Sequence, residues 1–72
     1  MNKKNKIKIV VNGKLLTVNL KFSLKNLFEK LKTPINKVAI ELNEEIVDKK
    51  KIKKIFLKNN DKIEIVHFIG GG

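Results

Sequence analysis

The sequence predicts an α+β fold in which one helix packs on one face of a mixed sheet of four to five strands. Two runs with strand-like alternation, residues 6–11 and 14–20, are joined by the hairpin dipeptide Asn12-Gly13. The apolar period then changes to helical spacing over residues 24–31. Short strand-like runs return after the helix, at residues 37–42, 46–47 and 62–68.

The first hairpin is predicted to have one apolar face. Ile7, Ile9 and Val11 share one side of the first strand, and both turn residues, Asn12 and Gly13, tolerate the positive φ angles of a tight turn. The second strand supplies its own inward set, Leu16, Val18 and Leu20. Such a hairpin needs a covering layer for this apolar face.

The helix is predicted to supply that layer. Its apolar stripe has the spacing i, i+3, i+4, i+7 and consists of Leu24, Leu27, Phe28 and Leu31. Ser23 is the expected N-cap, and Thr33-Pro34 ends the helix because a residue before proline avoids helical geometry. A helix of about nine residues is too short to stand alone, so it must pack on the sheet.

The second half is predicted to complete the sheet. Val38, Ile40 and Leu42 face inward on a third strand, and Ile46-Val47 forms a short edge strand. The Lys-rich residues 48–55 form a connection tethered by two isoleucines, Phe56-Leu57 packs against the core, and Asp61 stabilises the turn before the last strand. These two isoleucines are Ile52 and Ile55.

One economical arrangement places the first strand centrally, the second strand on one side and the last strand, parallel to the first, on the other. This is the β-grasp, or ubiquitin-like, architecture. We expect a single domain over residues 1–69 and a flexible functional glycine tail over residues 70–72.

Composition excludes several kinds of chemistry. The 72 residues contain no cysteine and a single histidine, His67, so there is no disulfide, no thiol nucleophile and no histidine cluster for a metal. We find no catalytic constellation, no metal site and no bound cofactor to predict. No run approaches the roughly 20 apolar residues of a membrane span, and no signal peptide is recognisable. We expect a cytoplasmic protein without a membrane partner.

The net charge of +10 raises the question of a polyanionic partner. Every basic residue is Lys, whereas recognition of phosphates and bases relies heavily on Arg. Lys, Ile and Asn together make up half of the chain, which indicates a compositional bias rather than a designed patch. We therefore expect no specific nucleic-acid partner.

The unusual feature is the end of the chain, VHFIGGG. By alternation Val66 and Phe68 face outward, with Val10 and Ala39 as possible extensions of this patch, and His67 faces inward at the edge of the core. Three glycines without side chains can enter a narrow channel and present the terminal carboxylate to another enzyme. Adenylation would make that carboxylate an acyl donor. The protein would then be a carried substrate and not an enzyme.

Two stretches, VAIELNEEIV and FLKNNDKIEIVHFIGGG, resemble the ThiS family of sulfur carrier proteins in thiamine biosynthesis. Shared features are Asn43 with an acidic turn, the approach from Leu57 to Ile65, and the Gly-Gly end after an apolar pair. The likeness covers residues 38–72. Asn60 replaces the usual Gly before Asp61, and Asn tolerates the left-handed conformation of such a turn.

The resemblance implies a cycle. A ThiF-like enzyme would adenylate Gly72 with ATP and Mg²⁺, a cysteine desulfurase or related donor would supply sulfur for a thiocarboxylate, and a ThiG-like thiazole synthase would consume it. Gly70 and Gly71 would thread into the partner active sites. Val66, Phe68 and Ile69 would dock on the partners.

Three other functions remain open at this point. The small subunit of molybdopterin synthase shares the fold and the end chemistry, but its chains tend to be longer and carry prolines before Gly-Gly. A ubiquitin-like modifier has a similar terminus. An RNA-binding β-grasp module of the TGS kind would use the Lys-rich surface and would not need free glycines.

Overall fold

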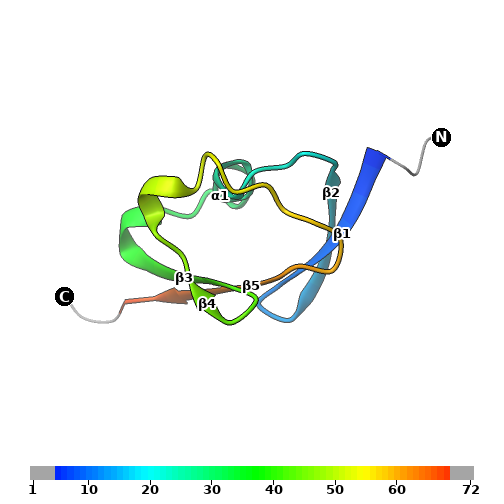
Figure 1. Cartoon of the computed structure of the whole chain (residues 1–72). Helices are drawn as coiled ribbons and strands as arrows, with labels where there is room; N and C mark the ends of the chain where they lie inside the picture. The colour runs from blue at the N-terminus through cyan, green and yellow to red at the C-terminus, as the bar shows by residue number, and fades with distance from the viewer. Residues whose placement is uncertain (1–4, 69–72) are drawn as a thin grey trace.

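The computed structural model describes residues 5–68 and confirms the predicted β-grasp arrangement (Figure 1). One five-stranded sheet has the order β2-β1-β5-β3-β4, and the pair of β1 and β5 is parallel. Helix α1 lies over one face of this sheet. The elements are β1 (Lys6–Val11), β2 (Lys14–Asn19), α1 (Leu24–Leu31), η2 (Ile35–Lys37), β3 (Val38–Leu42), β4 (Glu45–Ile46), η3 (Lys49–Lys51) and β5 (Lys62–His67), where η denotes a 3-10 helix.

The first hairpin forms as predicted. Asn12 and Gly13 have φ angles of 48° and 82°, and Val11 pairs with Lys14 directly across the turn. Leu20 differs from its predicted inward position and is exposed, because β2 ends at Asn19 and Leu20 already belongs to the following turn.

Ser23 caps helix α1 reciprocally with Asn26. The Ser23 hydroxyl accepts a 3.0 Å hydrogen bond from the Asn26 amide, and the Asn26 side-chain oxygen accepts one of 3.0 Å from the Ser23 amide. Lys32 ends the helix in the left-handed conformation, with φ 57°. The cap therefore satisfies two amides that a short helix would otherwise leave without partners.

The core lies between α1 and the inward face of the sheet. Leu24, Leu27 and Phe28 of the helix are buried, whereas Leu31, the last member of the stripe, is partly exposed. Ile52 is buried and Ile55 half-buried, so both tether the Lys-rich connection as predicted. The sheet and the loops supply the remaining buried apolar residues, namely Ile7, Ile9, Val18, Val38, Ile40, Leu57, Ile63 and Ile65.

Phe56 corrects another prediction. Leu57 is buried as expected, but Phe56 is exposed. Phe56 forms an isolated bridge with Ser23, and the Leu57 amide donates to the Phe22 carbonyl. Adjacent residues in an extended segment point to opposite sides, so burying Leu57 turns Phe56 outward.

Asp61 and Asn43 lock the turn that leads into β5. The buried Asp61 carboxylate accepts hydrogen bonds from the Lys58 amide at 2.7 Å and from the Asn43 side-chain nitrogen at 3.0 Å. The Asn43 side-chain oxygen accepts a third, of 2.9 Å, from the Lys62 amide. Asn60 adopts the left-handed conformation, with φ 74°. The predicted role of Asp61 in its turn is therefore confirmed.

We expect Asp61→Ala to lower the free energy of unfolding by about 2 kcal/mol, because it removes the buried carboxylate that accepts two part-buried hydrogen bonds. The matched control is Asp48→Ala. Asp48 also accepts a backbone hydrogen bond, from Lys50 at 2.9 Å, but is exposed, so its loss should cost about 1 kcal/mol or less. Urea unfolding measures both. Equal losses in the two variants would contradict the assigned role of Asp61.

Candidate functional site

The candidate site lies at the carboxyl end of β5, a strand flanked by β1 and β3. On the β1 side, pairing covers Val10 with Lys62 and Val11 with Ile63, after which β1 turns away. On the β3 side, pairing continues as far as Val38 opposite His67. The last residues of β5 therefore extend beyond β1 and keep β3 as their one strand neighbour in residues 5–68.

Where β1 turns away, the Asn12 side chain continues the hydrogen bonding with β5. Its oxygen accepts a 2.7 Å hydrogen bond from the Ile65 amide, and its nitrogen donates at 3.3 Å to the Ile65 carbonyl. This side-chain amide occupies the position of one further residue of β1. Backbone groups two residues apart face the same side of a strand, so those of His67 point to the side that β1 has left.

Side chains at the end of β5 divide between the two faces as the alternation predicts. Ile63 and Ile65 are buried beneath the helix layer. Val66 and Phe68 are 55% and 56% exposed. Two apolar side chains are therefore presented to solvent immediately before the end of the described chain.

Phe68 is held in place by two contacts with other segments. Its amide donates a 3.1 Å hydrogen bond to the Lys37 carbonyl, which extends the pairing with the β3 side. The Lys49 ammonium nitrogen lies 5.2 Å from the centroid of the Phe68 ring, within the range of a cation–π interaction. Sequence reasoning did not single out Lys49, because nothing local distinguishes it from the adjacent lysines.

The apolar patch is smaller than the alternation suggested. Ala39 pairs with Val66 and is half-buried, so it does extend the patch. Val10 lies opposite Lys62, and Glu64 separates that position from Val66 along β5. We define the exit patch as Ala39, Val66 and Phe68. Sequence reasoning also missed two exposed apolar side chains, Leu15 and Ile46, which lie on other strands.

The prediction that His67 packs at the edge of the core is wrong. His67 is exposed, although its partner Val38 is fully buried. The cause is its position at the end of β5, where β1 no longer flanks the strand. Among residues 5–68 no side-chain hydrogen bond of His67 is found.

Four predicted site residues lie outside the described residues. They are Ile69, proposed to dock, Gly70 and Gly71, proposed to thread, and Gly72, proposed to carry the covalent chemistry. The predicted boundary between domain and tail, after Ile69, lies outside them as well.

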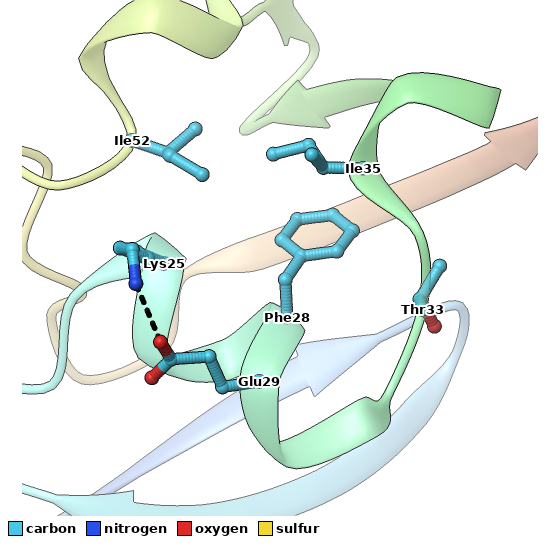
Figure 2. A pocket seen from close by; sticks show the side chains of 6 residues that line it. All are labelled: Lys25, Phe28, Glu29, Thr33, Ile35 and Ile52. Atoms are coloured by element: carbon cyan, nitrogen blue, oxygen red, sulfur yellow. Dashed lines mark hydrogen bonds and ion pairs between the residues drawn. The ribbon is translucent and has the colours of Figure 1, made fainter.

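A shallow pocket of about 310 Å³ lies between α1, η2 and η3 (Figure 2). Phe28, Ile35 and Ile52 form its apolar floor, with Thr33 at one side. On the rim, the Lys25 ammonium donates to the Glu29 carboxylate, and this contact lowers the pKa of Glu29. The pocket brings together no set of groups suited to acid–base or nucleophilic catalysis.

The rest of the described surface adds no further reactive site. A second hollow of about 480 Å³ is lined by Lys6, Lys8, Thr17 and Asn59. Residues 5–68 contain no group of three or more side chains able to hold a metal ion. No helix within the same range is long and apolar enough to cross a membrane.

Comparison with protein families finds a match to the ThiS family over residues 9–72. Among solved structures, the crystal structure of the thiamine biosynthesis protein (ThiS) from Geobacter metallireducens is similar, with a TM-score of 0.80 and 30% identity. That match covers 92% of this chain and 100% of the other.

Two kinds of curated relative match the sequence. A protein named Thiazole synthase, from Paramagnetospirillum magneticum, is 38% identical over 66 residues, which cover 92% of this chain but 20% of the relative. This chain thus spans about one fifth of the length of that relative. The protein named Sulfur carrier protein ThiS, from Bacillus subtilis, is 50% identical over 35 residues, which cover 49% of this chain and 53% of the relative.

The division of side chains along β5 predicts different costs for neighbouring truncations. Ile65→Ala should lower the free energy of unfolding by about 2–5 kcal/mol, because it opens a cavity in the core. Phe68→Ala should cost about 1 kcal/mol or less, because it removes an exposed ring and one cation–π contact. Urea unfolding of both variants is the measurement. A loss for Phe68→Ala as large as that for Ile65→Ala would show that Phe68 belongs to the core.

Proposed function

The chain belongs to the ThiS family, and from this premise we propose that it is a sulfur carrier of thiamine biosynthesis that carries sulfur on Gly72. Within this proposal the protein is a substrate of other enzymes and supplies no catalytic residue of its own. ATP and Mg²⁺ belong to the adenylating partner. The family match favours the thiamine pathway over the molybdopterin alternative.

The single observation that supports the proposal most is how β5 ends. The strand is anchored in the middle of the sheet, and Phe68, which follows it and is the last residue that the structure describes, precedes Gly72 by four positions. Four extended residues span at most about 14 Å, enough to reach into an enzyme cleft. A rigid strand followed by residues that are mainly glycine suits delivery of a carboxylate into a narrow site.

The chemistry requires activation because a carboxylate is a poor acyl donor. Attack of the Gly72 carboxylate on the α-phosphorus of ATP gives an acyl-adenylate and releases pyrophosphate. A persulfide sulfur then attacks the acyl carbon, and AMP leaves with the electrons of the C–O bond. Attack of a thiol on the resulting acyl disulfide releases the thiocarboxylate and forms a disulfide between donor and thiol. In this scheme a cysteine desulfurase or a related donor supplies the persulfide.

A ThiG-like thiazole synthase is the proposed consumer of the thiocarboxylate. In support, sequences similar to this chain form about 20% of two proteins named Thiazole synthase, from Paramagnetospirillum magneticum and Magnetococcus marinus. A carrier-like segment within a protein of that name is consistent with the two acting together. A ThiF-like enzyme is the proposed partner for adenylation.

Residues near the terminus divide the work in this proposal. Gly70 and Gly71 thread through the partner's channel and place Gly72 at the reacting centre. Ile69 and the exposed Val66 and Phe68 dock on the surface around the entrance. Exposed apolar side chains beside the tail can bind without disturbing the core, which lies on the other face of β5.

Intact-mass spectrometry tests the proposed chemistry. The protein is incubated with the adenylating enzyme from the same organism, MgATP and a sulfur donor. We expect a mass shift for the adenylate and then the exchange of one oxygen for sulfur, mapped to Gly72 by fragmentation. The control carries one alanine added after Gly72; it should fold normally and remain unmodified. Absence of both modifications in the unaltered chain would refute the proposal.

Phe68→Ala tests the docking role separately from folding. We expect the Kd for the adenylating enzyme to rise about tenfold, because an exposed aromatic residue at an interface contributes more than 1 kcal/mol. The matched control is Leu15→Ala, which truncates another exposed apolar side chain, on β2. Calorimetric titration should give nearly the wild-type Kd for this control. Equal effects of the two substitutions would remove the docking role from Phe68.

A further inference from the structure

We propose that Lys37, Lys49, Lys50 and Lys51, the exit lysines, form a cationic docking surface for a partner enzyme with carboxylates around its active-site entrance. The inference rests on the proposed function and adds the charge of the partner to it. The exit lysines and the exit patch both lie near the carboxyl end of β5. The lysines contribute charge, whereas the exit patch contributes apolar contact.

Two contacts place the exit lysines beside the end of β5. The Lys37 carbonyl accepts the hydrogen bond from the Phe68 amide, and the Lys49 ammonium lies 5.2 Å from the centre of the Phe68 ring. Lys49, Lys50 and Lys51 together constitute η3. Figure 1 shows η2 and η3 at the same end of the molecule as the carboxyl end of β5. The Lys49 charge therefore lies beside Phe68, and the segments that carry Lys37, Lys50 and Lys51 lie at the same end of the molecule.

These charges are largely uncompensated within the protein. In residues 5–68 a single salt bridge forms, between Lys25 and Glu29 on α1. Asp48 is the one acid among residues 48–55, which contain five lysines. Its carboxylate accepts from the Lys50 amide and caps η3. The segment thus presents a net positive charge, and a partner that met it with carboxylates would gain electrostatic complementarity.

The arrangement favours a protein partner over a nucleic acid. Lys49 covers one face of the Phe68 ring, which limits stacking of a base on that aromatic side chain. All cations at the site are Lys, which lacks the planar fork that grips phosphates in two places. The adjoining exit patch is apolar, as expected for contact with a protein surface.

Charge at this position would act mainly on association. Complementary fields raise association rates by 10- to 1,000-fold at low ionic strength, and the Debye length shortens to about 8 Å at physiological salt. A partner surface of opposite sign would therefore orient the tail towards the channel before the apolar contacts form.

The test compares two triple variants of equal net charge. The exit variant is Lys49→Gln, Lys50→Gln and Lys51→Gln. The distal control changes Lys6, Lys8 and Lys58 to Gln. Lys6 and Lys8 line one hollow with Asn59, and Lys58 precedes Asn59, so these lysines lie near the start of β5, at the opposite end of the strand from Phe68. Each variant lowers the net charge from +10 by three, to +7. Thermal unfolding by circular dichroism verifies that both fold.

Stopped-flow association with the adenylating enzyme from the same organism is the measurement, repeated over a range of salt concentrations. We expect the exit variant to associate about tenfold more slowly at low salt and to show a shallower salt dependence, with less than a twofold change for the distal control. Equal slowing by both variants would indicate overall charge and overturn the proposal. An unchanged rate for the exit variant would overturn it too.

Two further measurements distinguish this proposal from a packing effect at Phe68 and from a nucleic-acid site. Lys49→Arg keeps a cation over Phe68 and should associate like the wild type, whereas a rate as slow as that of Lys49→Gln would assign the effect to packing. Single-stranded RNA binding is measured in parallel. If the exit variant lost RNA affinity but associated normally with the enzyme, the surface would be a nucleic-acid site. Adenylate formation by the wild type tests the proposed function separately. If no adenylate forms, the proposed function fails, and the association rates of the variants still test the docking surface.

Discussion

The position of β5 between β1 and β3 is the constraint on which the rest of the structure depends. A strand that arrives last in the chain must enter a gap between two strands that precede it, and its direct pairing with β1 covers only two residue pairs. Side-chain amides extend this short pairing. Asn59 accepts from the Lys8 amide at 2.8 Å before it, and Asn12 binds both backbone groups of Ile65 after it.

This pattern of pairing explains how the carboxyl end of β5 can be held in place and remain accessible. Up to Ile65 the strand is bonded on both sides and its inward side chains are buried. Beyond Ile65 it keeps β3 on one side, and at Phe68 the Lys37 carbonyl still holds the backbone. In the proposed function, a backbone already held at Phe68 leaves fewer residues to be ordered on entering a partner, which lowers the entropy cost of binding.

The sequence features that carry the family resemblance prove to be largely structural. Asn43 and Asp61 bond to each other and to the backbone around the start of β5, and Asn60 supplies the left-handed residue of that turn. Parity along the strands, the N-cap at Ser23 and the hairpin at Asn12-Gly13 could all be predicted, because each depends on neighbours in sequence. Burial of side chains at the ends of strands could not be predicted in this way. Leu20 and His67 have the inward parity of core residues, but they lie where a strand or its neighbour ends, and that depends on segments distant in sequence.

The same distinction applies to the site. Alternation identified Val66 and Phe68 as outward, yet the contact between Lys49 and Phe68 joins residues 19 positions apart and has no local signature. In the proposed function the reacting residue is a glycine, which has no side chain with which to distinguish partners. Selectivity must therefore come from residues upstream of the glycines. The exit patch offers shape and apolar contact, and the exit lysines offer charge. Both lie outside the buried core, so either could change with a partner's surface while the packing beneath β5 stayed the same.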